Sequence, residues 1–239
     1  MILPPAQRAC IFVSPAMGQR KGYAFPASRL RLRDNSNMAI IVVGGHSRNL
    51  GKTSVAAGLI AALPERVWTA VKITQFGHGI CSVNGESCDC AVDEHTMAIS
   101  EERDRSGDSD TSRFLLAGAR RALWVRTKQG YLAEAMPALR QRIAGAADLM
   151  VESNSIMKFL RPDLYLTVLD YETADFKTSA REFLDLADAV LLHENSRAQP
   201  KWDGVSLKLL QGKPVFRVRP PAYVSAELVE WVREKAFGS

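Results

Sequence analysis

The sequence predicts an α/β protein of three layers, built on a doubly wound and mostly parallel sheet. From residue 38 onward, short apolar runs alternate with segments of helical period, which is the order expected for repeated βαβ units. The apolar runs are too uniformly hydrophobic to leave one face in water, so helices should cover both faces of the sheet. With 239 residues, the chain is long enough for one sizeable domain with appendages.

The elements can be placed in order along the chain. The first expected strand is the β-branched run AIIVV, which stops at two glycines, and the first helix begins after a short polar turn. The apolar runs place strands at 39–43, 67–73, 121–127, 148–153, 163–169, 189–194 and 214–218. The helical periods fall at 52–62, 110–118, 131–145, 178–187 and 224–236.

One connection interrupts this alternation. Residues 74–109 are rich in Gly, Ser, Cys and Asp and are longer than an ordinary connection in a compact domain. We therefore expect a Cys-rich inserted loop or hairpin within a domain that covers residues 38–239.

Residues 1–37 differ in composition from the rest of the chain. They are rich in Pro, Ser and Arg, they lack a sustained period, and Met38 directly precedes the first strand. This pattern leaves three interpretations open: a disordered basic tail, a leader, or a start codon assigned too early. The segment contains six basic residues and one acidic residue: Arg8, Arg20, Lys21, Arg29, Arg31, Arg33 and Asp34.

The charge balance argues against nucleic acid as a partner. The chain carries a net charge of +5, and the same excess is found in residues 1–37, so residues 38–239 are neutral. A nucleic-acid interface would need basic residues clustered on the folded part. The sequence also lacks an apolar run of the roughly 18–20 residues that a membrane span requires. We expect a cytoplasmic protein without a membrane partner.

The stretch VVGGHSRNLGKTSVAAGLI, residues 42–60, predicts a phosphate-binding loop. A strand, a glycine turn and a helix that opens with Gly-Lys-Thr form the context in which this motif binds nucleotide phosphates. His46 stands where the usual pattern has glycine, and Gly44 and Gly45 supply a turn one residue earlier. The fold class is therefore expected to be of the P-loop NTPase type. The expected nucleotide contacts are His46, Ser47, Arg48, Asn49, Leu50, Gly51, Lys52, Thr53 and Ser54.

Two side chains of this loop have expected roles in chemistry. Lys52 should bridge the β- and γ-phosphate oxygens, and the Thr53 hydroxyl should bind Mg²⁺. We find no convincing Asn-Lys-x-Asp segment, so the residues leave GTP and ATP both open.

Beyond the loop, the chain resembles the molybdopterin-guanine dinucleotide biosynthesis protein B (MobB) family. The likeness rests on the loop stretch, on DTSRFLLAGARRALWV (110–125), and on ADLMVESNS (147–155) followed by RPDLYLTV (161–168). It covers roughly residues 38–194. In this family, P-loop proteins bind GTP and assist in attaching a nucleotide to the molybdenum cofactor. Two departures are Ser153, where the family has glycine, and residues 195–239, which have no counterpart that we can align.

The resemblance assigns roles to further residues. It places Lys72, Asp110 and Arg113 at the nucleotide and Glu152 at Mg²⁺ or at the attacking water, and it implies a homodimer. From the residues alone, without the resemblance, Asp110 and Arg113 are expected to form only an exposed i,i+3 ion pair at a helix start. Glu152 ends a central strand at its carboxyl edge, where α/β proteins bind ligands, which favours a functional role.

The cysteines form a second candidate site. His78, Cys81, Cys88 and Cys90 lie within thirteen residues and could together bind Zn²⁺ in a tetrahedral site, with His95 as a spare ligand. The alternative is a set of reduced thiols in a glycine-rich hairpin, because the spacing is not one of the well-known zinc spacings.

These observations lead to one main hypothesis and two alternatives. The main hypothesis is a MobB-like nucleotide-binding protein that uses GTP and Mg²⁺ with weak hydrolysis, in which Lys52 and Glu152 are catalytic. In this role its partners would be proteins of molybdenum cofactor biosynthesis. The alternatives are a metal-delivery GTPase whose cargo site is the His/Cys cluster, and a P-loop kinase or ligase that acts on a small molecule.

Overall fold

The computed structural model describes residues 38–76, 96–194 and 197–238. These residues form an eight-stranded sheet in the order β3-β4-β2-β5-β1-β6-β7-β8, in which only β3 is antiparallel to its neighbour. The strands are β1 (Ala39–Gly45), β2 (Trp68–Phe76), β3 (Met97–Glu101), β4 (Arg121–Lys128), β5 (Asp148–Glu152), β6 (Leu164–Leu169), β7 (Ala189–His193) and β8 (Val215–Val218).

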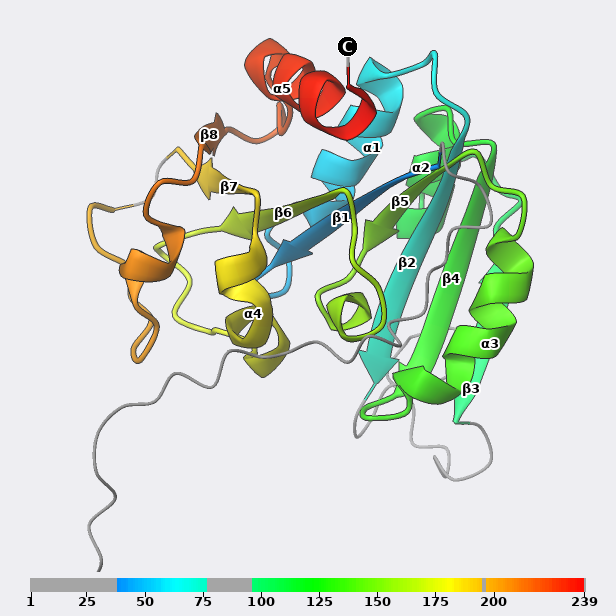
Figure 1. Ribbon diagram of the computed structural model, residues 1–239, viewed down its shortest axis with the longest axis horizontal. Helices are drawn as coiled ribbons and strands as arrows, with labels where there is room; N and C mark the ends of the chain where they lie inside the picture. The colour runs from blue at the N-terminus through cyan, green and yellow to red at the C-terminus, as the bar shows by residue number, and fades with distance from the viewer. Residues whose placement is uncertain (1–37, 77–95, 195–196, 239) are drawn as a thin grey trace, which may run out of the picture.

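Helices cover both faces of this sheet, as Figure 1 shows. One core cluster joins the sheet to α1 (Lys52–Ala62), α2 (Asp110–Leu116) and α5 (Ala226–Phe237). The cluster on the other face contains residues of α3 (Leu132–Ile143) and α4 (Thr178–Phe183). Short 3₁₀ turns complete the described elements: η1 (Ser155–Lys158), η2 (Leu184–Leu186) and η3 (Leu207–Leu210). The predicted three-layer, doubly wound α/β class is confirmed.

The order of the strands changes direction around β1. The chain passes from β1 over β5 to reach β2, and later returns to add β6 on the other side of β1. Such a switch point leaves a crevice at the carboxyl ends of the strands, where open α/β sheets bind ligands. The register pairs Val43 of β1 with Glu152 of β5, and Glu152 with Lys72 of β2. Two of the predicted site residues thus lie side by side next to the loop that follows β1.

The structure contains every predicted strand and helix, and one further strand. β2 continues to Phe76 and β3 occupies Met97–Glu101, so part of the segment 74–109 that was predicted as an insert is regular sheet. Sequence reasoning missed β3 because this strand lies at the edge of the sheet and its side chains are half-buried or exposed, which removes the apolar signal. Residues 1–37 and 77–95 lie outside the described residues, and the predicted hairpin with His78, Cys81, Cys88, Cys90 and His95 lies there too.

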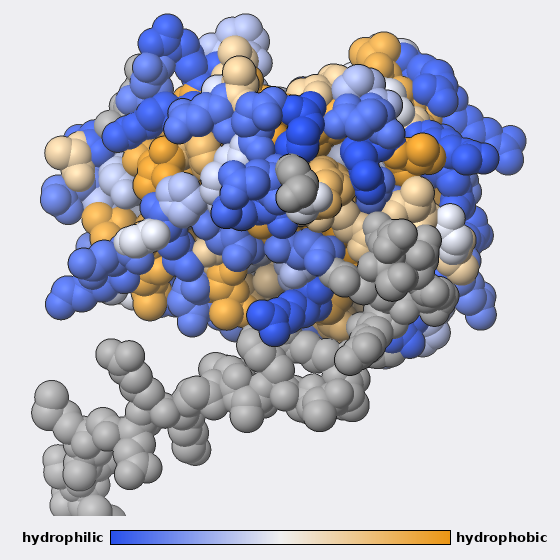
Figure 2. Space-filling model, turned by 45° about the horizontal axis from the view of Figure 1, so that its top comes forward, coloured by the Kyte–Doolittle hydropathy of each residue, from blue (hydrophilic) through white to orange (hydrophobic). Residues whose placement is uncertain are grey.

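The surface is mixed in character. Figure 2 shows a face on which hydrophilic residues predominate and hydrophobic ones occur in separate small groups. Among the described residues, no helix combines the length and the apolar character needed to cross a membrane.

A partly buried ion pair lies at the other end of the strands, where β1, β2 and β5 begin. Asp148, at the start of β5, is 1% exposed, and its carboxylate accepts two hydrogen bonds from the Arg66 guanidinium at 2.7 and 2.9 Å. The same carboxylate accepts a bond from the Ala39 N–H at 3.1 Å. It thereby joins the start of β1 to the start of β5 and to the turn before β2.

We expect Asp148→Asn to lower the free energy of unfolding by about 2 kcal/mol, because it leaves Arg66 without its charged partner. The exposed Glu101–Arg121 pair is the control, and Glu101→Gln should cost less than about 0.5 kcal/mol. Equilibrium urea denaturation measures both. Equal losses in the two variants would contradict the assigned role of Asp148.

Candidate functional site

The loop between β1 and α1 has the backbone of an anion cradle. Two of its residues have positive φ: Asn49 at 56° and Gly51 at 78°, and Gly51 is the N-cap of α1. A Cβ on Gly51 would lie 2.0 Å from Cε1 of Tyr223, so the close packing of Tyr223 requires glycine as much as the φ does. Within the described part of the chain, the backbone N–H groups of residues 47–54 donate to no protein acceptor. These donors, at the positive end of a helix, are available to phosphate oxygens.

Asn154 closes the strand side of the loop. Its side-chain oxygen accepts from the Gly45 N–H, and its side-chain nitrogen donates to the Gly45 carbonyl, each at 2.9 Å. A Cβ on Gly44 would lie 2.1 Å from the same Asn154 oxygen, which explains the glycine at that position. The Tyr165 hydroxyl donates to this oxygen as well, at 3.1 Å. Asn154 was not among the predicted residues, although it follows the strand that ends in Glu152.

His46 anchors the loop from within the protein. Its Nε2 accepts from the Asp170 N–H at 3.1 Å, so the ring proton is on Nδ1, which donates to the Asp175 carbonyl at 2.7 Å. This arrangement requires the neutral imidazole, and burial lowers the pKa of His46 accordingly. The ring stacks on Phe176 and packs against Trp202. Because the His46 N–H also donates to Val168, at 3.3 Å, the structure gives His46 a supporting position in the loop.

The segment after β6 supplies two further residues at the loop. The Ser47 hydroxyl donates to the Asp175 carboxylate at 2.7 Å, and the Lys177 N–H donates to the His46 carbonyl at 2.8 Å. Burial lowers the pKa of Lys177, and the nearby charges of Arg48 and Lys72 lower it further. Sequence reasoning missed Asp175 and Lys177, but the polar stretch DYETADFK at the carboxyl end of a predicted strand was an available signal.

Lys52 folds over the loop to which it belongs. Its ammonium donates to the Ser47 carbonyl at 2.6 Å. Burial lowers the pKa of Lys52 to about 8, and the carboxylate of Glu152 opposes this shift only in part. The lysine is therefore already desolvated and placed at the cradle, and a phosphate oxygen would supply the negative charge that it lacks.

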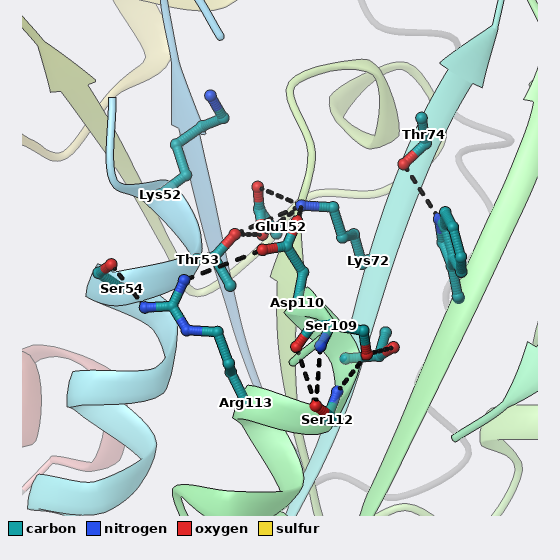
Figure 3. A network of polar contacts seen from close by, with 12 residues as sticks. Lys52, Thr53, Ser54, Lys72, Thr74, Ser109, Asp110, Ser112, Arg113 and Glu152 are labelled. Atoms are coloured by element: carbon teal, nitrogen blue, oxygen red, sulfur yellow. Dashed lines mark hydrogen bonds and ion pairs between the residues drawn. The ribbon is translucent and has the colours of Figure 1, made fainter. Parts of the chain in front are cut away.

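A second lysine organises the acidic residues beside the loop (Figure 3). The Lys72 ammonium donates to both Glu152 oxygens, at 3.1 and 3.2 Å, to the Thr53 hydroxyl oxygen at 3.3 Å, and to the Asp110 carboxylate. The Thr53 hydroxyl in turn donates to Glu152 at 2.7 Å. Four predicted site residues from β2, β5, α1 and α2 thus converge on one point.

Lys72 and Asp110 shift each other's pKa in the direction that favours the charged form. Burial alone would lower the pKa of Lys72, but Glu152 and Asp110 outweigh it, so that its pKa is raised. Burial likewise opposes the charge on Asp110, yet Lys72 holds the pKa of this carboxyl below its usual value. Both carboxylate and ammonium are therefore ionised near neutral pH.

The first turn of α2 holds Asp110 in place. Ser109 caps this helix: its hydroxyl accepts from the Ser112 N–H at 3.0 Å, while the Ser112 hydroxyl accepts from the Ser109 N–H at 3.0 Å. A carboxylate in the first turn is also favoured by the helix dipole. Arg113 lies 3.9 Å from Asp110 and donates to the Ser54 hydroxyl at 2.8 Å, so it links α2 to α1. Asp110 therefore takes part both in the i,i+3 ion pair with Arg113 and in the cluster around Lys72.

The oxygen atoms around Lys72 suit a hard cation. Mg²⁺ prefers carboxylate and hydroxyl oxygens and shares its remaining positions with water and substrate phosphates. Thr53, Asp110 and Glu152 offer that donor set beside the cradle, and an ammonium group already occupies the position of a cation among them. The described residues contain no group of three or more His, Cys, Asp or Glu side chains that could hold a metal ion on their own. Arg48 and Asn49, also predicted as nucleotide contacts, are exposed at the outside of the loop.

Comparison with known proteins supports the fold alone. No protein-family model matches the chain, and no curated protein matches its sequence. HypB from Helicobacter pylori, determined in complex with nickel, has a TM-score of 0.50 and 16% identity over 84% of this chain and 87% of that one. LpxK from Aquifex aeolicus, determined in complex with ATP, has a TM-score of 0.42 and 15% identity over 75% of this chain, which spans only 53% of LpxK.

The predicted P-loop NTPase type of fold is confirmed, since HypB shares the architecture along nearly the whole domain. The resemblance to the MobB family stays a prediction.

We expect nucleotide affinity to depend on pH through Lys52. Only the charged ammonium attracts phosphate, so affinity should be greatest below pH 8 and fall as the pH rises through that value. The decrease approaches about tenfold per pH unit above the pKa of the free protein. Equilibrium titration with labelled ATP from about pH 7 to about pH 9 measures it. Lys52→Arg is the control, because a guanidinium stays charged across this range. A constant wild-type affinity would contradict the assignment.

Proposed function

We propose that this protein is a Mg²⁺-dependent P-loop nucleotide-binding protein that slowly hydrolyses the terminal phosphate of a nucleoside triphosphate. The observation that carries the proposal is the convergence of Thr53, Lys72, Asp110 and Glu152 beside a loop that contains Lys52 and whose N–H groups have no acceptor among the described residues. A glycine-capped turn alone needs none of these charged side chains. Their joint position at the switch point of the sheet supports a site for phosphate and metal.

Different residues of the site would bind the phosphates and the metal ion. The N–H groups of residues 47–54 and the Lys52 ammonium would bind the β- and γ-phosphates and stabilise the charge that develops there. Thr53, Asp110 and Glu152 would hold Mg²⁺, which supplies Lewis-acid stabilisation of the phosphate oxygens when bound. Arg48 and Lys177, which are close enough for their charges to interact, would add positive charge at the loop. In hydrolysis, a water oxygen forms a bond to the γ-phosphorus while the bond to the bridging oxygen breaks, which yields inorganic phosphate and a diphosphate.

The finer assignment rests on the resemblance to the MobB family. It favours GTP as the nucleotide, a homodimer, and a role beside the proteins that attach a nucleotide to the molybdenum cofactor. Glu152, at the carboxyl end of β5, is the residue that we assign to Mg²⁺ and to the attacking water.

A metal-delivery GTPase is the second candidate. Two observations favour it: HypB, which shares this fold, was determined in complex with nickel, and the sequence carries His78, Cys81, Cys88 and Cys90 within thirteen residues. Hydrolysis at the phosphate loop would then control release of a metal held by these side chains.

The loop can be tested directly. We expect Lys52→Ala to weaken triphosphate binding by about 100-fold, because it removes the ammonium group that the loop itself places at the cradle. Lys158→Ala is the matched control, since Lys158 pairs with Glu182 at the surface, away from the loop. Isothermal titration calorimetry with GTP and ATP measures both variants and also decides which base is preferred. Unchanged affinity in Lys52→Ala would exclude the loop as the site.

Metal analysis separates the two candidates. If the His/Cys cluster delivers a metal, the purified protein should bind one exchangeable ion whose affinity changes by about tenfold or more between the diphosphate and triphosphate states. Cys88→Ser should lower that affinity and leave nucleotide affinity intact. A tightly held zinc ion that is insensitive to nucleotide would instead indicate a structural site.

A further inference from the structure

Lys72 occupies the centre of the oxygen set that we assign to the metal. Its ammonium lies 3.1 and 3.2 Å from the two Glu152 oxygens and 3.3 Å from Thr53 Oγ1, and it also contacts Asp110. Figure 3 shows the Thr53, Asp110 and Glu152 side chains pointing toward the Lys72 ammonium, while the Lys52 ammonium points away from them. The contacts of Lys72 are thus the contacts expected of a bound cation.

One oxygen set cannot hold both cations in this arrangement. A divalent ion needs these oxygens at about 2.1 Å and would sit inside the space that the ammonium now fills. Two positive charges at such a short distance would also repel each other strongly in a partly buried site. The Lys72 side chain is 16% exposed and Glu152 is 7% exposed, so little water screens the interaction.

Resting on the proposed function, we propose that Lys72 is a tethered counter-ion that fills the Mg²⁺ site in the nucleotide-free protein. It leaves the site when Mg²⁺ arrives with the nucleotide, and its ammonium then turns toward the phosphates. In this role, Lys72 holds Asp110 and Glu152 in position, and it discourages the entry of a metal ion without nucleotide.

The length and position of Lys72 make the movement possible. A lysine side chain carries its charge on a flexible four-carbon stem with several rotatable bonds. Lys72 lies in β2, next to β5, and its carboxylate partners lie beside the loop that contains Lys52. The triphosphate brings enough negative charge to accept both the metal ion and the displaced ammonium.

Binding of Mn²⁺ in the absence of nucleotide tests the proposal. Electron paramagnetic resonance measures the concentration of free Mn²⁺ and so gives the affinity. We expect Lys72→Met to bind one Mn²⁺ at least about tenfold more tightly than the wild type, because the competing charge is gone. Lys158→Met, at the surface pair with Glu182, should behave as the wild type does. Equal or weaker Mn²⁺ binding in Lys72→Met would overturn the proposal, since a merely structural lysine gives that result.

A second variant guards against a change in folding. Lys72→Arg keeps the charge but carries a larger, rigid group with more hydrogen bonds to the carboxylates. We expect it to bind Mn²⁺ without nucleotide no better than the wild type, and to weaken Mn²⁺ binding in the presence of a triphosphate analogue by about tenfold. Tight Mn²⁺ binding in Lys72→Arg would contradict the proposal. Nucleotide titration of the wild type tests the proposed function separately. If the wild type binds no nucleotide, the proposed function is wrong; if it binds nucleotide and the Mn²⁺ results differ from those expected, only the role of Lys72 is wrong.

Discussion

The register of three parallel strands is the constraint on which the site depends. Hydrogen bonds between β1, β5 and β2 set Val43 beside Glu152 and Glu152 beside Lys72. A shift by one residue in either pair would turn one side chain to the other face of the sheet. The ion pair of the buried Asp148 with the partly exposed Arg66 joins the amino ends of these strands and thereby helps to hold that register. The arrangement of the candidate site at the carboxyl ends of the strands thus depends in part on contacts at their amino ends.

The phosphate loop is held by its neighbours more than by its own sequence. His46 is bound to the segment after β6 through both ring nitrogens, and Asn154 grips Gly45 through both of its side-chain atoms. These bonds use neutral groups and do not involve the Lys52 ammonium, which contacts the Ser47 carbonyl of the same loop. Such preorganisation lowers the cost of ordering the loop when an anion binds.

Much of the fold could be predicted from the sequence, because parallel strands buried on both faces leave long apolar runs. The strands from β1 to β8 were visible in this way, apart from β3, which pairs at an exposed edge and needs no apolar face. In the site, Lys52 and Thr53 were evident from the motif. Lys72, Asp110 and Glu152 entered through family resemblance, and only the tertiary structure shows that they meet. Asp175 and Lys177 were missed because their contact with the loop is set by the tertiary structure, and the polar stretch after β6 indicates only that a ligand could lie nearby.

Tyr223 joins the segment before α5 to the loop between β1 and α1. This ring packs so closely on Gly51 that no larger residue would fit there, and the next residue, Val224, lies against Gly58 of α1. The packing around this loop and around α1 is therefore completed only by residues that lie far later in the sequence. During translation, a nascent chain that already contains the whole Gly-Lys-Thr motif but not residues 223–224 would lack the packing partners of Gly51 and Gly58.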